Sequence, residues 1–258
     1  MGGAVVRVIG ETPGAKLVAA VDRPGSQGIG KDAGELAGVG NLGLPVIDRI
    51  PSQLKGRPVI IDFSRPDASV RYLKQAATKR WPIVIGTTGF NNKQWSQIKG
   101  LARQTQALVA PNMSVGVNLL LGLLGPVAQS LGQAYDVELV EVHHRFKKDA
   151  PSGTALALGH TIAKALGRDL DRVGTFGRKG LVGERGKEEI GLSSVRAGDV
   201  VGEHTVIFGG LGERLEFVHR AQSRETFARG AVRAAQWIIG KKNGLYTMQD
   251  LLKLQPFG

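Results

Sequence analysis

The side chains most capable of chemistry are concentrated between residues 141 and 155. His143 and Lys147 can both transfer protons, and they stand close together in the sequence. The Pro-Ser-Gly-Thr run at 151–154 is typical of a helix start, with Ser152 as its N-cap. The free N–H groups at such a helix start bind anions. The segment therefore predicts a site that holds a small carboxylate substrate and transfers protons.

The same segment has an alternative interpretation, a solvated basic loop followed by a capped helix. A single His or Lys would favour that alternative, whereas the whole cluster favours a functional site. Glu141 shares a strand face with His143 and could orient its imidazole. We expect no metal site, because His143 and His144 would point to opposite faces of the strand and no further ligand spacing supports one.

The elements around this segment predict an α+β domain with an open mixed sheet. A strand is expected at 136–144 and a helix at 151–167. Three long β-rich segments follow, and short Gly-containing turns join them, so we expect them to be antiparallel neighbours. They lie at 189–197, 200–208 and 214–222.

The first 125 residues or so have a different texture, in which short apolar runs alternate with helical patterns. This alternation is typical of βαβ units and of a parallel sheet covered on both faces. The expected strands are 16–21, 59–63, 82–85 and 107–110. A helical pattern returns at 224–239, and 245–252 could form another short helix. We therefore predict an α/β chain with a Rossmann-like dinucleotide-binding domain at 1–114 and 224–258. A substrate-binding and oligomerisation domain is predicted at 115–223.

Three turns at strand ends are candidates for holding a nucleotide, because α/β sheets bind ligands at the carboxyl ends of their strands. Asp22 closes the first strand and could accept hydrogen bonds from ribose hydroxyls, and Arg23 could pair with a 2′-phosphate. Both NADPH and NADH therefore remain possible cofactors. The other two turns contain Gly86, Thr87 and Thr88, and Ala110, Pro111, Asn112 and Met113.

The beginning of the chain departs from a complete dinucleotide fold. Such a fold opens with a strand and a Gly-rich turn that precede the first helix. Here the first expected helix is already at 3–10. We therefore also consider an N-terminally truncated, non-catalytic remnant that folds and oligomerises without efficient cofactor binding. An ordinary α/β start that is no dinucleotide fold is the alternative for this segment alone.

Composition narrows the class of protein further. The chain has 258 residues and a formal charge of +12, but its Lys and Arg are spread along the sequence and only 5 % of residues are aromatic. This distribution speaks against a nucleic-acid partner, which usually meets a basic patch or stacking aromatics. With no cysteine there are no disulfides or thiolate sites. No apolar run reaches the roughly 18 residues of a membrane span, and the N-terminus shows no signal-peptide pattern. We therefore expect a cytoplasmic protein with no membrane partner.

Residues 141–155 closely resemble the signature of a family of bacterial lysine biosynthesis, the 4-hydroxy-tetrahydrodipicolinate reductases, also called dihydrodipicolinate reductases. In this chain the segment reads Glu-Val-His-His-Arg-Phe-Lys-Lys-Asp-Ala-Pro-Ser-Gly-Thr-Ala. The likeness extends over nearly the whole chain. It includes the segments 32–35, 62–66, 84–90, 112–118 and 196–204. Together these motifs are highly specific.

The resemblance implies that NADPH or NADH reduces a small cyclic dicarboxylate with loss of water. It implies that His143 is a proton donor or acceptor and Lys147 a proton donor. The implied substrate-binding residues are His144, Gly153 and Thr154. The implied cofactor-binding residues are Asp22 and Arg23 at the ribose and 2′-phosphate, with Gly86, Thr87, Thr88, Ala110, Pro111, Asn112 and Met113 in the two later turns. The family is typically a homotetramer associated through the sheet of the second domain.

Overall fold

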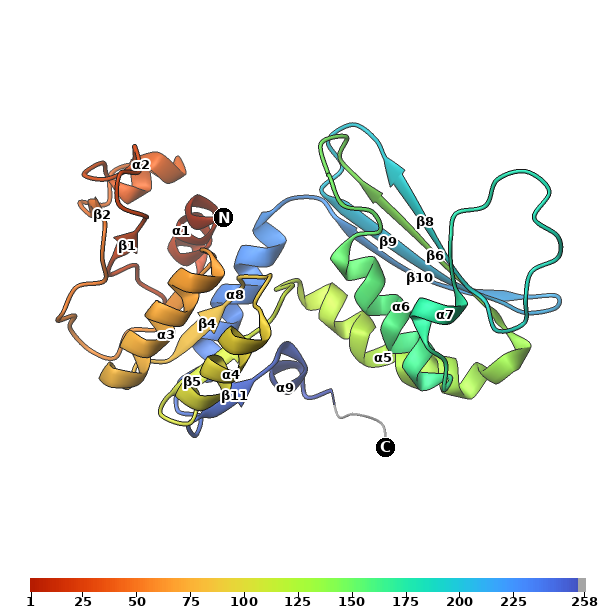
Figure 1. Cartoon of the computed structure of the whole chain (residues 1–258). Helices are drawn as coiled ribbons and strands as arrows, with labels where there is room; N and C mark the ends of the chain where they lie inside the picture. The colour runs from red at the N-terminus through yellow and green to blue at the C-terminus, as the bar shows by residue number, and fades with distance from the viewer. Residues whose placement is uncertain (255–258) are drawn as a thin grey trace. The chain divides into compact units, whose positions relative to one another are not determined.

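The computed structural model describes residues 1–254, which divide into two compact units (Figure 1). Unit 1 comprises Met1–Ser114 and Arg224–Leu251, and unit 2 comprises Val115–Ser223 and continues from Leu252. The expected boundary placed residues 252–254 in the first domain, and the structure differs there. The side chain of Leu254 packs closely over Gly122 of unit 2, where a Cβ would lie only 2.5 Å from Leu254 Cδ1. Residues 255–258 of the expected first domain lie outside the described residues.

Unit 1 contains two separate parallel sheets. The larger has the order β11-β5-β4-β3 and the smaller pairs β1 with β2. Their bounds are β1 Ala20–Val21, β2 Val46–Ile47, β3 Ile60–Asp62, β4 Ile83–Ile85, β5 Gln106–Val109 and β11 Gly244–Tyr246. The strand expected at 16–21 is thus reduced to its last two residues. The segment expected to be helical from 245 instead begins as a strand, because Leu245 joins the edge of β5, and only α9 (Met248–Leu252) is helical.

Helices cover both faces of the larger sheet of unit 1, as the apolar strands predict. On one face, α3 (Pro66–Lys79) and α4 (Asn92–Leu101) enclose a core with Ile83 and Ile85. On the other, α1 (Gly2–Glu11) and α8 (Glu225–Ile238) pack together with Ile61 and Phe63. A short helix, α2 (Ala33–Ala37), is capped by Asp32. This three-layer arrangement presents the ends of β3, β4 and β5 at one edge of the sheet.

Unit 2 is built on one mixed sheet of order β10-β9-β6-β8-β7. Its strands are β6 Asp136–His143, β7 Gly174–Phe176, β8 Ile190–Arg196, β9 Gly202–Gly209 and β10 Arg214–Ala221. β9 is antiparallel to both β10 and β6, whereas β8 is parallel to β6 and to β7. The prediction of three consecutive antiparallel neighbours is therefore wrong for β8, because β6 inserts between β8 and β9.

The helices of the described part of unit 2 share one core with one face of this sheet. Leu124 of α5 (Val115–Leu131), Leu158 of α6 (Gly153–Ala165) and Leu170 of α7 (Leu170–Val173) meet Phe208 of β9 there. With the short η1 (Gly132–Ala134), α5 is long and apolar enough to cross a membrane by length and composition. Its place in this core accounts for its apolar character equally well.

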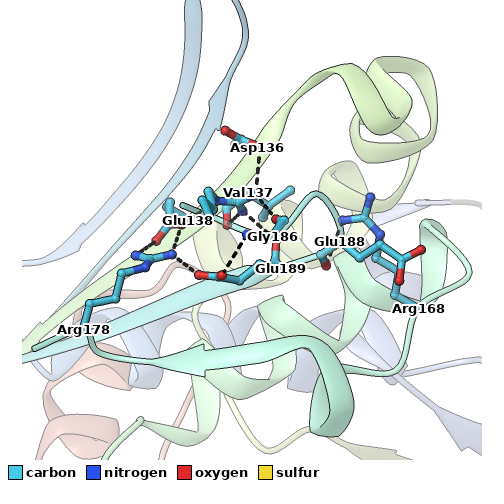
Figure 2. Close-up of polar contacts among 9 residues, drawn as sticks. Asp136, Val137, Glu138, Arg168, Arg178, Gly186, Glu188 and Glu189 are labelled. Carbon is cyan, nitrogen blue, oxygen red and sulfur yellow. Dashed lines mark hydrogen bonds and ion pairs between the residues drawn. The ribbon is translucent and has the colours of Figure 1, made fainter. Parts of the chain in front are cut away.

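Two arginines, Arg185 and Arg178, hold the long loop between β7 and β8 against the sheet, and Figure 2 shows Arg178 beside Glu138 and Glu189. Arg185 donates to the carboxylates of Asp136 at 2.8 Å and Glu138 at 3.1 Å, and also to three backbone carbonyls. Arg178 donates to both carboxylate oxygens of Glu138 and also contacts Glu189. Such bidentate guanidinium–carboxylate pairs are the strong form of ion pair. They hold the loop ends against β6 and β8.

Candidate active site and nucleotide-binding turns

Side chains from three strands of unit 2 converge at the end of β6. Glu141 and His143 point to the helix-covered face, as their spacing predicts. Across the parallel pair, Arg196 of β8 lies directly opposite His143. Across the antiparallel pair, His204 of β9 lies directly opposite Glu141. The sheet register therefore brings a carboxylate, a guanidinium and two imidazoles together.

Glu141 is the centre of this cluster and is only 2 % exposed. Arg196 donates to its two oxygens at 2.8 and 2.9 Å, and the backbone N–H of Ser152 donates to Oε1 at 3.2 Å. Its Oε2 also contacts Nδ1 of His143. Burial alone would raise the pKa of Glu141, but hydrogen bonds from Arg196, Ser194 and His143 lower it to about 2. Glu141 is therefore an ionised carboxylate throughout the physiological range.

The contact with Glu141 decides the tautomer of His143. An ionised carboxylate only accepts, so Nδ1 carries the hydrogen and Nε2 is the nitrogen left for proton exchange. Burial lowers the pKa of His143, Glu141 offsets this in part, and the charges of Lys147 and Arg196 lower it further. The imidazole is thus neutral at pH 7. A Cβ at Gly202 would lie 2.9 Å from Nε2, so the ring needs a glycine beside it.

The first turn of α6 lies beside Glu141. Ser152 caps the helix as predicted, because its Oγ accepts from the N–H of Ala155 at 3.1 Å. Gly153 and Thr154 form the beginning of the helix, and a side chain at Gly153 would meet open space. The N–H groups and dipole at this helix start favour a bound anion. The structure therefore brings Ser152, Gly153 and Thr154 close to Glu141 and His143.

Lys147 and His144 lie in the loop that follows β6. Lys147 Nζ is 2.8 and 2.9 Å from the two carboxylate oxygens of Asp149. The loop is tied to the turn after β8, because the N–H of Arg145 donates to Gly198 O at 3.1 Å. Nδ1 of His144 is buried and has no hydrogen-bond partner within the described structure. A ligand oxygen at this loop would satisfy that nitrogen.

Two members of the cluster, Arg196 and His204, were not expected from the sequence as functional residues. His204 is buried, with Nε2 3.1 Å from Ser152 Oγ and its ring edge-on to His143 at 5.2 Å between centroids. Burial lowers its pKa to about 4, so it is a neutral neighbour of His143. A buried Glu141 demands a cationic partner, but sequence alone cannot choose among the many arginines. No group of three or more metal-ligating side chains occurs within residues 1–254.

Asp22 lies exposed at the end of β1 in unit 1. It accepts from the backbone N–H of Arg23 at 2.7 Å and from Ser26 Oγ at 2.5 Å. These hydrogen bonds lower the pKa of Asp22, the one from Ser26 most strongly. The carboxylate is therefore ionised, and each of its oxygens retains a lone pair for a further donor.

In the turn after β4, the side chain of Thr87 is buried within unit 1. Its hydroxyl is not available to a ligand, because it lies 2.8 Å from Ser69 Oγ and 3.4 Å from Asp62 Oδ2 in a buried network. Thr87 can therefore contact a ligand only through its backbone, whereas Thr88 is exposed. Gly86 lies against the ring of Phe63, where a Cβ would be 2.3 Å from Cε1.

The turn after β5 is anchored from within unit 1. Ala110 and Met113 are buried, whereas Pro111 is exposed. Oδ1 of Asn112 accepts from the N–H of Ser114 at 2.8 Å, which closes the turn. The ends of β4 and β5 are in register, since Ile85 pairs with Val109. Both turns therefore project from the same edge of the sheet, as the sequence predicts.

Comparison with known proteins covers both units. Residues 1–113 match the family described as dihydrodipicolinate reductase, N-terminus, and residues 116–252 match its C-terminus. The chain belongs to the dihydrodipicolinate reductase family. A 4-hydroxy-tetrahydrodipicolinate reductase of Syntrophus aciditrophicus is 51 % identical over 98 % of this chain and 94 % of its own length. One of Alkalilimnicola ehrlichii is also 51 % identical, over 98 % of this chain and 95 % of its own length.

Solved structures support the same fold. A dipicolinate-bound dihydrodipicolinate reductase of Paenisporosarcina aligns over 96 % of this chain and 94 % of its own, with a TM-score of 0.74 and 24 % identity. An amine dehydrogenase of Mycobacterium smegmatis aligns over 99 % of this chain and 94 % of its own, with a TM-score of 0.56 and 14 % identity. The Rossmann-like unit with a mixed-sheet unit is thus the fold of this reductase family. Nothing in these comparisons favours a non-catalytic remnant.

Proposed function

We propose that this chain is a 4-hydroxy-tetrahydrodipicolinate reductase of lysine and diaminopimelate biosynthesis. Its substrate, 4-hydroxy-tetrahydrodipicolinate, is a small cyclic dicarboxylate, which gains a hydride and a proton and loses water to give tetrahydrodipicolinate. The observation that carries the proposal is the cluster of His143, Glu141 and the α6 N-terminus, in a chain half identical to reductases of this name. Unit 2 is the substrate-binding domain in this proposal.

The residues of unit 1 fit a nicotinamide dinucleotide. The ionised Asp22 suits ribose hydroxyls, and the adjacent Arg23 suits a 2′-phosphate. The first turn of α1 has no side-chain cap, which leaves it suited to a phosphate. The turns 86–88 and 110–113 would lie along the nicotinamide side. Bound NADPH or NADH supplies the hydride.

Within unit 2, each proposed residue has one task. The N–H groups of Gly153 and Thr154 hold a substrate carboxylate at the α6 N-terminus, and His144 offers its buried, unpartnered Nδ1 to another substrate oxygen. Lys147 carries a proton on Nζ beside Asp149 and is the proton donor. His143 exchanges a proton at Nε2, while Glu141 fixes the opposite nitrogen.

The test is turnover of 4-hydroxy-tetrahydrodipicolinate by the purified full-length chain, followed through the absorbance of the reduced nicotinamide. We expect substrate-dependent oxidation of NADPH and of NADH, and the ratio of the two kcat/KM values measures the preference that Asp22 and Arg23 leave open. Omission of the substrate is the control. Cofactor oxidation that does not depend on this substrate would contradict the proposal.

We further propose that the chain is a cytoplasmic homotetramer associated through the face of the unit 2 sheet that lies opposite its helices, with neither a membrane nor a nucleic acid as partner. Val195 and Val218 are 42 and 43 % exposed on that face, which suits burial against another copy. Light scattering should give the mass of four chains. Val218→Asp should give a smaller species, and a wild-type monomer would contradict this assembly.

A further inference from the structure

Arg196 donates hydrogen bonds in two directions from the end of β8. Its two terminal nitrogens grip Glu141 at 2.8 and 2.9 Å. The same Nη2 also donates to the backbone carbonyl of Asp149 at 2.7 Å. One guanidinium therefore touches both the carboxylate that orients His143 and the residue that holds Lys147.

The contact of Arg196 with Glu141 determines the charge beside His143. Glu141 is buried and ionised beside His143, and an isolated carboxylate at that position would favour the imidazolium form. The guanidinium of Arg196 cannot lose its proton at any pH at which a protein is folded. Its bidentate contact therefore cancels the charge of Glu141 while leaving the carboxylate oxygen that accepts from His143 in place.

The contact of Arg196 with Asp149 determines the position of the loop that carries Lys147. Asp149 receives Lys147 Nζ on both of its carboxylate oxygens and Arg196 on its carbonyl oxygen. The neighbouring turn after β8 is bonded to the same loop, since the N–H of Ala197 donates to His143 O at 2.9 Å. Loss of the Arg196 side chain would therefore release one end of the loop that carries Lys147.

We propose that Arg196 is a positioning residue that sets the pH at which His143 binds its proton and anchors the loop of Lys147. The inference deepens the proposed function, and it rests on that function only in naming His143 and Lys147 as the groups that exchange protons. Arg196 itself needs no contact with substrate or cofactor in this role.

Among the groups that face His143, Arg196 is the one whose charge can be changed by itself. Glu141 lies on the same strand, Lys147 in the following loop, and His204 on β9 with His219 next to it on β10. From α6 the nearby group is the uncharged Ser152. His204 is neutral above about pH 4, so it does not titrate together with His143. A change at Arg196 therefore alters the charge around His143 without altering the number of other ionised groups.

The decisive measurement is the pKa of His143, followed by NMR of the histidine side chains in the full chain without cofactor or substrate. The His143→Gln spectrum identifies its signal among the five histidines. In Arg196→Met we expect this pKa to rise by about one unit or more. In Arg196→Lys we expect a smaller rise, because an ammonium keeps the charge but not the bidentate contact. Arg172→Met, at an exposed arginine of α7, is the matched control and should leave the pKa of His143 unchanged.

A pKa of His143 that is the same in Arg196→Met and in the wild type would overturn the proposal. If Arg196→Met does not fold, the double variant Glu141→Gln/Arg196→Met is used instead, because it also removes the buried charge of Glu141. That double variant should return the pKa of His143 to near its wild-type value, and a large shift in either direction would contradict the charge cancellation.

The kinetics provide a second measurement. The limb of the pH profile of kcat/KM that belongs to His143 should move to higher pH in Arg196→Met. A wild-type chain without turnover would contradict the proposed function while leaving the NMR result intact.

Discussion

His143→Gln is expected to lower kcat by at least about 10²-fold, the scale of a lost general acid or base. Glutamine is about as long as the imidazole and reaches the place of Nε2, but it lacks the Nδ1–H that contacts Glu141. Its amide cannot exchange a proton near neutral pH as the imidazole Nε2 does. Steady-state turnover with saturating NADPH, together with the thermal midpoint of unfolding, measures both effects.

The pH profile makes this expectation specific. Burial lowers the pKa of His143, so its limb in the wild-type profile of kcat/KM should lie below the ordinary imidazole value of 6.5. That limb should be absent from His143→Gln. The matched control is His160→Gln, since His160 is an exposed residue of α6 and should leave turnover unchanged. Near-normal turnover in His143→Gln would remove the assignment of this residue.

Features set by neighbouring residues are those that the sequence predicted best. Ser152 caps α6, as the Pro-Ser-Gly-Thr run predicts. This cap depends on backbone geometry within one helical turn. The shared face of Glu141 and His143 follows from the two-residue period of a strand, and the structure confirms it. The placement of Glu141, His143 and Ser152 in the proposed active site could therefore be predicted from local sequence patterns.

Features that depend on distant pairing were missed. Arg196 lies 55 residues after Glu141, and they meet only because β8 joins β6 in parallel, which turn lengths alone did not indicate. Thr87 belongs to a turn predicted to hold a nucleotide, but its hydroxyl meets Asp62, 25 residues away, because β3 and β4 are neighbours. Strand β11 is too short to be recognised from its sequence pattern, and it forms by pairing in parallel with β5. In each case the register of a sheet, rather than residue type, made the decision.

One distant contact of this kind supports the second large expectation, that Gly230→Ala destabilises unit 1. Gly230 lies in the buried part of α8, and a Cβ there would be only 1.7 Å from the carbonyl oxygen of Met113. The obstacle is backbone rather than the end of a flexible side chain, and Met113 is itself 1 % exposed. The helix or the turn 110–113 must therefore move to admit a single methyl group.

Overpacking of this severity should cost about 3 kcal/mol or more of the free energy of unfolding. For a chain of this size that corresponds to a fall of roughly 6–12 °C in Tm, measurable by calorimetry. Gly100→Ala is the matched control, because Gly100 is an exposed helical glycine of α4 whose added Cβ would meet no atom within 4 Å. That change should be neutral or stabilise by about 0.5–1 kcal/mol through helix propensity. Since the turn 110–113 is proposed to hold the cofactor, any folded Gly230→Ala protein should also have a raised KM for NADPH. Equal thermal stability of Gly230→Ala and Gly100→Ala would show that the Met113 carbonyl does not lie against α8.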